Sequence, residues 1–194
     1  MTQEGVHSVH SNGKTRWGRW ISRNRPGQPV GWLTTVVVFG VIFGLLTVAY
    51  LYSTATTMIQ YQEVRLAVAQ VVYPGIVLNF LGFVGALLLL KFRKWGWLLV
   101  TGFFVSSILS AIPVLIKGAD NLKVEMNGLH RVTYAPLDIV IWETLIGLAV
   151  MVFLGLKPIR SLFSIGRQQW LYGLGFGVLL FLARWVYMIL FVPE

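Results

Sequence analysis

Three strongly polar residues interrupt long apolar segments of the chain. Arg184 lies within Trp170–Val192, Glu143 within Ile139–Leu156 and Asn79 within Tyr73–Leu90. A charge inside an apolar membrane segment costs roughly 3 kcal/mol or more, so such a residue usually has a partner or a function. An arginine and a glutamate can satisfy each other through charge-assisted hydrogen bonds. The residue types therefore predict an ion pair between Glu143 and Arg184.

The expected depths of these residues favour one shared polar cluster. At about 1.5 Å per helical residue, Arg184 lies roughly 12 Å, Glu143 roughly 6 Å and Asn79 roughly 9 Å below the same membrane surface. A further apolar segment contributes Ser106, Ser107 and Ser110 at similar or greater depth. Three interpretations stay open: an ion pair that fixes helix register, an arginine that extends to the headgroups unpaired, and a ligand or ion site.

Other kinds of chemistry find little support. The three histidines, His7, His10 and His130, lie outside the apolar segments, so paired histidine ligands for a haem inside the bilayer are not available. Cysteine is absent, and the chain contains neither a His-Glu-x-x-His nor a Gly-x-Ser-x-Gly motif. We expect no catalytic residue, metal ligand or cofactor, and the sequence favours a protein that is not an enzyme.

Small residues spaced four apart predict close helix packing. The pattern Gly173-x-Gly175-x-Gly177 resembles a dinucleotide loop only superficially, because no strand precedes it, the third spaced glycine is missing and the pattern lies within an apolar segment. Small residues at this spacing let helix backbones approach closely within a membrane. The pairs are Gly40 with Gly44, Gly82 with Ala86, Ser106 with Ser110, and Gly173 with Gly177.

The elements that must position these residues are membrane-spanning helices. Of the 194 residues, 56% are hydrophobic and only 12% are charged, and the mean hydropathy is +0.72. Five apolar segments approach the ~20 residues that a helix needs to cross a bilayer. They are Val30–Tyr52, Tyr73–Leu90, Trp95–Ile116, Ile139–Leu156 and Trp170–Val192. We expect an all-α integral membrane protein with five spans, although four spans and a surface or re-entrant fifth helix remain an alternative.

Basic residues predict the orientation. With a cytoplasmic N-terminus, eleven lysines and arginines fall on the inside: Lys14, Arg16, Arg19, Arg23, Arg25, Lys91, Arg93, Lys94, Lys157, Arg160 and Arg167. Four fall outside: Arg65, Lys117, Lys123 and Arg131. Because cytoplasmic loops are enriched in these residues, we expect the N-terminus inside and the C-terminus outside, in a bacterial inner membrane. The enrichment of lysine and arginine in cytoplasmic segments then explains the net charge of +9, so no nucleic acid is expected as a partner.

The chain divides into a basic tail, residues 1–29, and a single membrane domain, residues 30–192. The tail is too long and too polar for the start of a cleavable signal peptide. Within it, Trp17, Trp20 and Ile21 share a helix face between arginines, which predicts an interfacial helix on anionic headgroups.

The outer loop, residues 117–138, contains a hairpin signal. Asn127-Gly128 is typical of a two-residue β-turn, which would pair Met126 with Leu129, Glu125 with His130 and Val124 with Arg131. A glutamate beside a histidine could make this loop sensitive to the external pH. The alternative is a plain polar connector.

Two classes of function remain open. The first is a non-enzymatic accessory, assembly or sensing component that acts through contacts with lipids, a protein partner or further copies of itself. The second is a small transporter or channel with an outward-facing polar site; against it, the spans show no inverted repeat and no broken helices.

Overall fold

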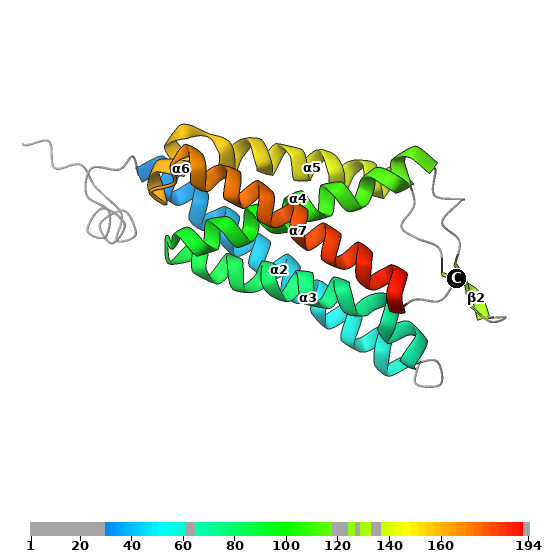
Figure 1. The fold of residues 1–194 in the computed structure, drawn as a ribbon. Helices are drawn as coiled ribbons and strands as arrows, with labels where there is room; N and C mark the ends of the chain where they lie inside the picture. The colour runs from blue at the N-terminus through cyan, green and yellow to red at the C-terminus, as the bar shows by residue number, and fades with distance from the viewer. Residues whose placement is uncertain (1–29, 61–64, 118–123, 127–128, 133–136, 192–194) are drawn as a thin grey trace, which may run out of the picture.

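The computed structural model describes residues 30–60, 65–117, 124–126, 129–132 and 137–191 (Figure 1). The elements in chain order are α2 (Val30–Gln60), α3 (Arg65–Leu90), α4 (Lys94–Lys117), β1 (Val124–Met126), β2 (Leu129–Val132), α5 (Leu137–Gly155), α6 (Lys157–Leu162) and α7 (Arg167–Phe191). The predicted basic tail and its interfacial helix lie outside these residues.

Five of the helices are long and apolar enough to cross a membrane, which confirms the five predicted segments. The apolar spans are Gly31–Thr56, Tyr73–Leu90, Lys94–Ile116, Leu137–Gly155 and Arg167–Leu190. The fifth segment forms one continuous helix, α7, and its length matches the other spans. Helices α2 and α3 continue beyond their apolar segments.

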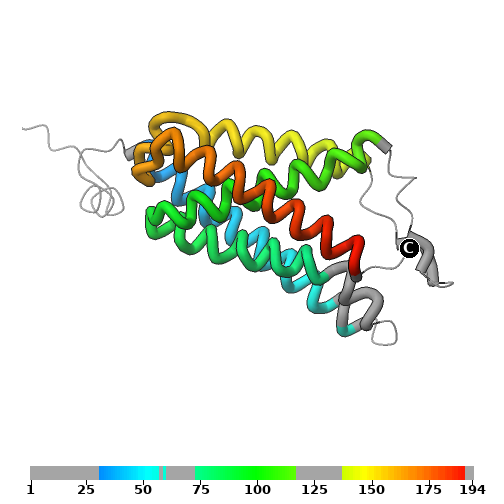
Figure 2. The backbone as a smooth tube through the Cα atoms, viewed as in Figure 1, coloured from blue at the N-terminus to red at the C-terminus, as the bar shows by residue number. Residues whose placement is uncertain are grey.

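Helix α4 makes extensive contacts with three of the other long helices. It packs against α3, α5 and α7, whereas α2 packs mainly against α3 (Figure 1, Figure 2). Successive long helices run in opposite directions (Figure 1). The connection from α3 to α4 is a tight turn in which Phe92 adopts a positive φ of 50°. Helix α6 joins α5 to α7 and also contacts α2.

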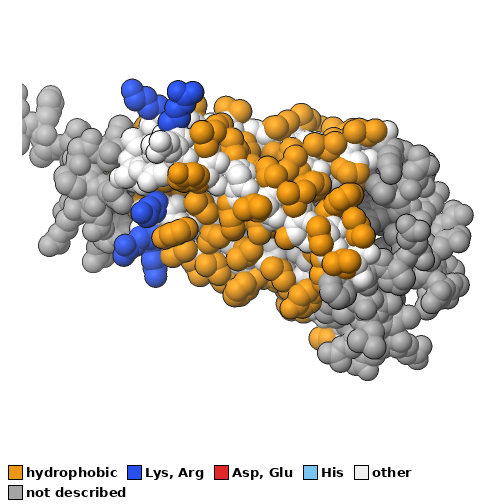
Figure 3. Space-filling view, viewed as in Figure 1, with side chains coloured by type: hydrophobic (Ala, Val, Ile, Leu, Met, Phe, Trp, Pro, Cys, Tyr) orange, Lys and Arg blue, Asp and Glu red, His pale blue; other side chains and the backbone are white. Residues whose placement is uncertain are grey.

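The two ends of the bundle differ. We call one the basic end, because lysine and arginine side chains gather on it in Figure 3. The helix ends and connections there contain Lys91, Arg93, Lys94, Lys157, Arg160 and Arg167. The opposite end, near β1 and β2, is the strand end. Between the two ends, hydrophobic side chains cover much of the visible face, as a lipid-facing surface requires (Figure 3).

The best-packed core lies toward the basic end. Its fully buried members include Leu33, Leu89, Trp97, Leu154, Ile159 and Leu162, contributed by α2, α3, α4, α5 and α6. At this end three residues join α3 to α4 and the short helix α6 joins α5 to α7, whereas at the strand end 19 residues separate α4 from α5. Short connections and a buried apolar core therefore hold the helices together in the basic half of the bundle.

Strands β1 and β2 pair antiparallel. Met126 lies opposite Leu129, but Val124 lies opposite Val132, because an irregularity in the pairing falls between Val124 and Met126. The expectation that Val124 would face Arg131 is therefore wrong: an extra residue on β2 shifts the register by one. The Asn127-Gly128 turn and the side chains of Glu125 and His130 lie outside the part of the chain that the structure describes.

Candidate functional site

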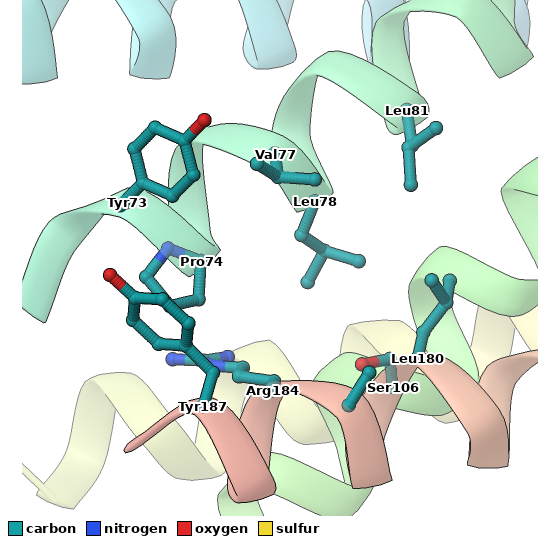
Figure 4. A pocket seen from close by; sticks show the side chains of 10 residues that line it. Tyr73, Pro74, Val77, Leu78, Leu81, Ser106, Leu180, Arg184 and Tyr187 are labelled. Carbon is teal, nitrogen blue, oxygen red and sulfur yellow. The ribbon is translucent and has the colours of Figure 1, made fainter. Parts of the chain in front are cut away.

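A groove opens between α3 and α7 in the half of the bundle nearer the strand end. It encloses about 550 Å³, including the part open to the surroundings (Figure 4). Its walls are largely apolar, with Leu78 and Leu81 on α3 and Leu180 on α7, and Ser106 of α4 also lines it. We call it the α3–α7 groove. The part of this space that compares with ligand cavities is about 180 Å³, which is smaller than typical small-molecule sites of roughly 300–1,000 Å³.

Pro74 helps to shape the α3 wall. It lies inside α3 and lines the groove, and a proline has no backbone N–H to donate to the preceding turn. The next residue, Gly75, lies so close to α2 that an added Cβ would be 3.0 Å from the Tyr50 hydroxyl oxygen. A glycine at this position thus leaves room for the end of the Tyr50 side chain.

Arg184 is the charged member of the groove. Its half-buried side chain donates a hydrogen bond from Nη1 to the Ser110 hydroxyl oxygen at 3.3 Å. That hydroxyl in turn donates to the Ser106 carbonyl oxygen at 2.8 Å. Arg184 therefore reaches from α7 onto α4, where it meets a neutral partner. Among the described residues no carboxylate pairs with its guanidinium.

Ser106 places a second hydrogen-bond donor in the groove. Its side chain is fully buried, and its hydroxyl oxygen has no hydrogen-bond partner among the described residues. Leaving a buried polar group unsatisfied costs about 1–3 kcal/mol. Arg184 and Ser106 line the same groove from neighbouring helices (Figure 4).

Glu143 lies elsewhere, so the expected ion pair with Arg184 is not formed. The Glu143 side chain is exposed on α5, next to Trp142, which is 65% exposed. Helices α5 and α7 each pack against α4 instead of forming an extensive contact with one another. Similar depth in the membrane did not bring these residues together, because rotation about the helix axis determines which neighbour a side chain faces.

Asn79 and Ser107 also fall outside the hydrogen bonds of Arg184. The Asn79 side-chain amide donates to the Gly75 carbonyl oxygen of its own helix at 2.9 Å. Ser107 is half-buried on α4. Of the six residues of the predicted polar cluster, the structure thus connects Arg184, Ser110 and Ser106.

Two tyrosines lie at the strand-end side of the groove, and sequence reasoning missed them. The rings of Tyr73 and Tyr187 stack with centroids 6.4 Å apart and an interplanar angle of 28°. Tyr187 follows Arg184 by three residues, and residues at this spacing share a helix face. The spacing of Arg184 and Tyr187 was visible in the sequence and indicated that they share a helix face. It could not show that Tyr73 on α3 lies beside Tyr187.

Three of the four predicted small-residue pairs lie at helix contacts. A Cβ on Gly177 would collide with the Val105 side chain, and one on Gly173 would be 2.9 Å from the Trp97 ring. Gly40 faces Leu90, and Gly44 faces Ala86 with 3.5 Å between an added Cβ and the Ala86 Cβ. Gly82, which the sequence pairs with Ala86, faces Phe103 and Thr47. These contacts join α4 to α7, α2 to α3, and α3 to α4.

Together, the apolar helices define the class: this is an integral membrane protein with five helices that can span the bilayer. Comparison with models of protein families, with curated proteins and with solved structures finds no match to the chain. Within the described residues, no group of three or more histidines, aspartates or glutamates could hold a metal ion. The features that bear on function are the groove, the exposed glutamate and the apolar core of the basic half.

Proposed function

We propose that the protein is a non-enzymatic membrane component that acts by binding lipid or protein partners. The observation that carries this proposal is the state of its two intramembrane charges. Arg184 meets a neutral serine in a groove open to the surroundings, and Glu143 is exposed on α5. Since charges within a bilayer require compensation, both residues favour a partner supplied from outside the chain.

The distribution of polar groups favours binding over conduction. Arg184, Ser106 and Ser110 lie between the middle of their helices and the strand end. The core of the basic half is filled by apolar side chains such as Leu33, Leu89 and Trp97, and the hollow between α4 and α7 at that end shares no lining residue with the α3–α7 groove. A transport path needs polar groups or a cavity through both halves, whereas a binding site needs them in only one.

The orientation belongs to the same proposal. The excess of lysine and arginine supports a cytoplasmic basic end and an external strand end, in a bacterial inner membrane. Strands β1 and β2 then form an external hairpin that could contact a partner. In this orientation the α3–α7 groove opens in the outer leaflet.

The proposal can be tested by purifying the full chain in a mild detergent and identifying what co-purifies at fixed stoichiometry. A bound protein partner is expected to be lost from Glu143→Gln but retained by Asp138→Asn, a matched control because both residues are exposed acids on α5. Lipid bound in the groove is expected to depend on Arg184. In parallel, proteoliposomes should show no flux of ions or small solutes. Flux that Arg184→Gln abolishes would instead favour the small-transporter alternative.

A further inference from the structure

We propose that the α3–α7 groove binds a long-chain carboxylate, with its anionic head at Arg184 and Ser106 and its hydrocarbon chain on the apolar walls. This inference rests on the proposed binding function and names a ligand class for one of its sites. Its basis is the joint presence of a guanidinium, a buried hydroxyl without a partner and apolar walls in one open groove.

The hydrogen-bonding groups in the groove favour an anion. The Arg184 guanidinium can only donate, and one of its N–H groups meets the Ser110 hydroxyl at 3.3 Å, a long distance for a charged donor. The Ser106 hydroxyl has a proton to donate and no partner among the described residues. A carboxylate offers two acceptor oxygens, one for each donor, and its charge balances that of the arginine.

The depth of these groups favours a carboxylate over a phospholipid headgroup. With ~1.5 Å per residue measured from the middle of each span, Arg184 lies roughly 8 Å and Ser106 roughly 2 Å from the middle. The hydrocarbon core extends about 15 Å to each side of its middle, so phosphates lie well above both donors. A carboxylate is smaller, and it can lose its charge by protonation while it moves into the apolar region.

The remaining walls suit a hydrocarbon chain. Tyr73 and Tyr187 lie roughly 13 Å from the middle of their spans, near the level of the interface, where tyrosines are enriched. From there the groove continues to Leu81 and Leu180, which lie within about 3 Å of the middle. The groove thus spans most of one leaflet, and an amphiphile could enter it sideways from the bilayer.

The test measures palmitate binding to the full chain in nanodiscs of phosphatidylcholine. Wild-type protein should bind saturably, with one palmitate per chain, and uncharged methyl palmitate should not compete. Arg184→Gln should weaken binding about tenfold or more, as expected for loss of a charge-assisted contact. Arg93→Gln, which changes an exposed arginine at the basic end, should bind as the wild type does.

Two further variants keep the test decisive if Arg184→Gln fails to fold. Ala183→Phe fills the groove from an exposed position and leaves the arginine in place, so it should also abolish palmitate binding. Ser106→Ala should weaken binding without loss of folded protein, because the hydroxyl has no partner to lose. Ser161→Ala, on the exposed surface of α6, is its control.

Three results would overturn the assignment. They are palmitate binding that none of the groove variants alters, equal competition by methyl palmitate, and equal competition by phosphatidylglycerol, which would identify a phosphate-headed lipid as the occupant. None of them contradicts the broader proposal, which fails separately if proteoliposomes show Arg184-dependent flux.

Discussion

The indole Nε1 of Trp97 donates a buried hydrogen bond of 3.2 Å to the carbonyl oxygen of Leu154, 57 residues further along the chain. The carbonyl of Leu154 belongs to the last turn of α5, and the residue four positions on is Pro158, which has no N–H. Trp97 thus supplies the donor that the helix itself lacks at this end. The bond ties α4 to the end of α5 inside the core of the basic end.

Trp97→Phe should lower the stability of the protein. The phenyl ring keeps most of the apolar contact but leaves the Leu154 carbonyl without its donor, a loss of about 1–3 kcal/mol for a buried group. Thermal unfolding in detergent measures the effect. Trp95→Phe is the matched control, because Trp95 is 60% exposed and the same replacement there should leave the unfolding temperature nearly unchanged. Equal effects of the two replacements would contradict the role assigned to Trp97.

The crossing of α4 and α7 at Gly177 should not tolerate a methyl group. A Cβ at Gly177 would collide with Val105 and lie 3.0 Å from the Gly102 carbonyl oxygen, so Gly177→Ala should destabilise by about 1–3 kcal/mol. Gly175 has nothing within 4 Å of an added Cβ. Gly175→Ala should therefore be neutral or slightly stabilising, since alanine has the higher helix propensity. If both variants unfold at the same temperature, the helices do not cross closely at Gly177.

Substitutions of Glu143 and Arg184 should act independently. The two side chains lie on helices that each pack against α4, and Arg184 bonds to Ser110. We expect the double variant Glu143→Gln/Arg184→Gln to lose as much unfolding free energy as the two single variants lose together, within about 0.5 kcal/mol. A coupling above ~1 kcal/mol would show that the two charges meet in the membrane after all.

Single cysteines can test the proposed orientation directly, because the chain has none of its own. Cysteines at Ser11 and Arg93 should be shielded from an impermeant thiol reagent in intact cells, whereas one at Asn121 should react. The expectation follows from the bias of lysine and arginine toward cytoplasmic segments. Labelling at position 11 in intact cells would reverse the assigned orientation, and labelling at both 93 and 121 would disprove the span between them.

The apolar helices could be predicted from the sequence because their cause is local. A helix satisfies its own backbone hydrogen bonds, so about 20 consecutive apolar residues are enough to predict a membrane-spanning helix. The small-residue spacing of Gly173 and Gly177 likewise marked one face of α7 as a candidate contact. It did not identify Trp97, Thr101 and Val105 as the opposing surface on α4.

The contacts of the polar side chains could not be predicted from the sequence alone. From the sequence, Arg184, Glu143 and the serines could be assigned to apolar segments at approximate depths, but the ion pair predicted between Glu143 and Arg184 is not formed. Only the tertiary structure decided that Arg184 meets Ser110 and that Glu143 faces outward. The physical reason is that depth along a helix follows from residue number, whereas the neighbour of a side chain depends on the rotation and packing of whole helices. Those are determined by contacts between residues far apart in the chain, such as Trp97 with Leu154.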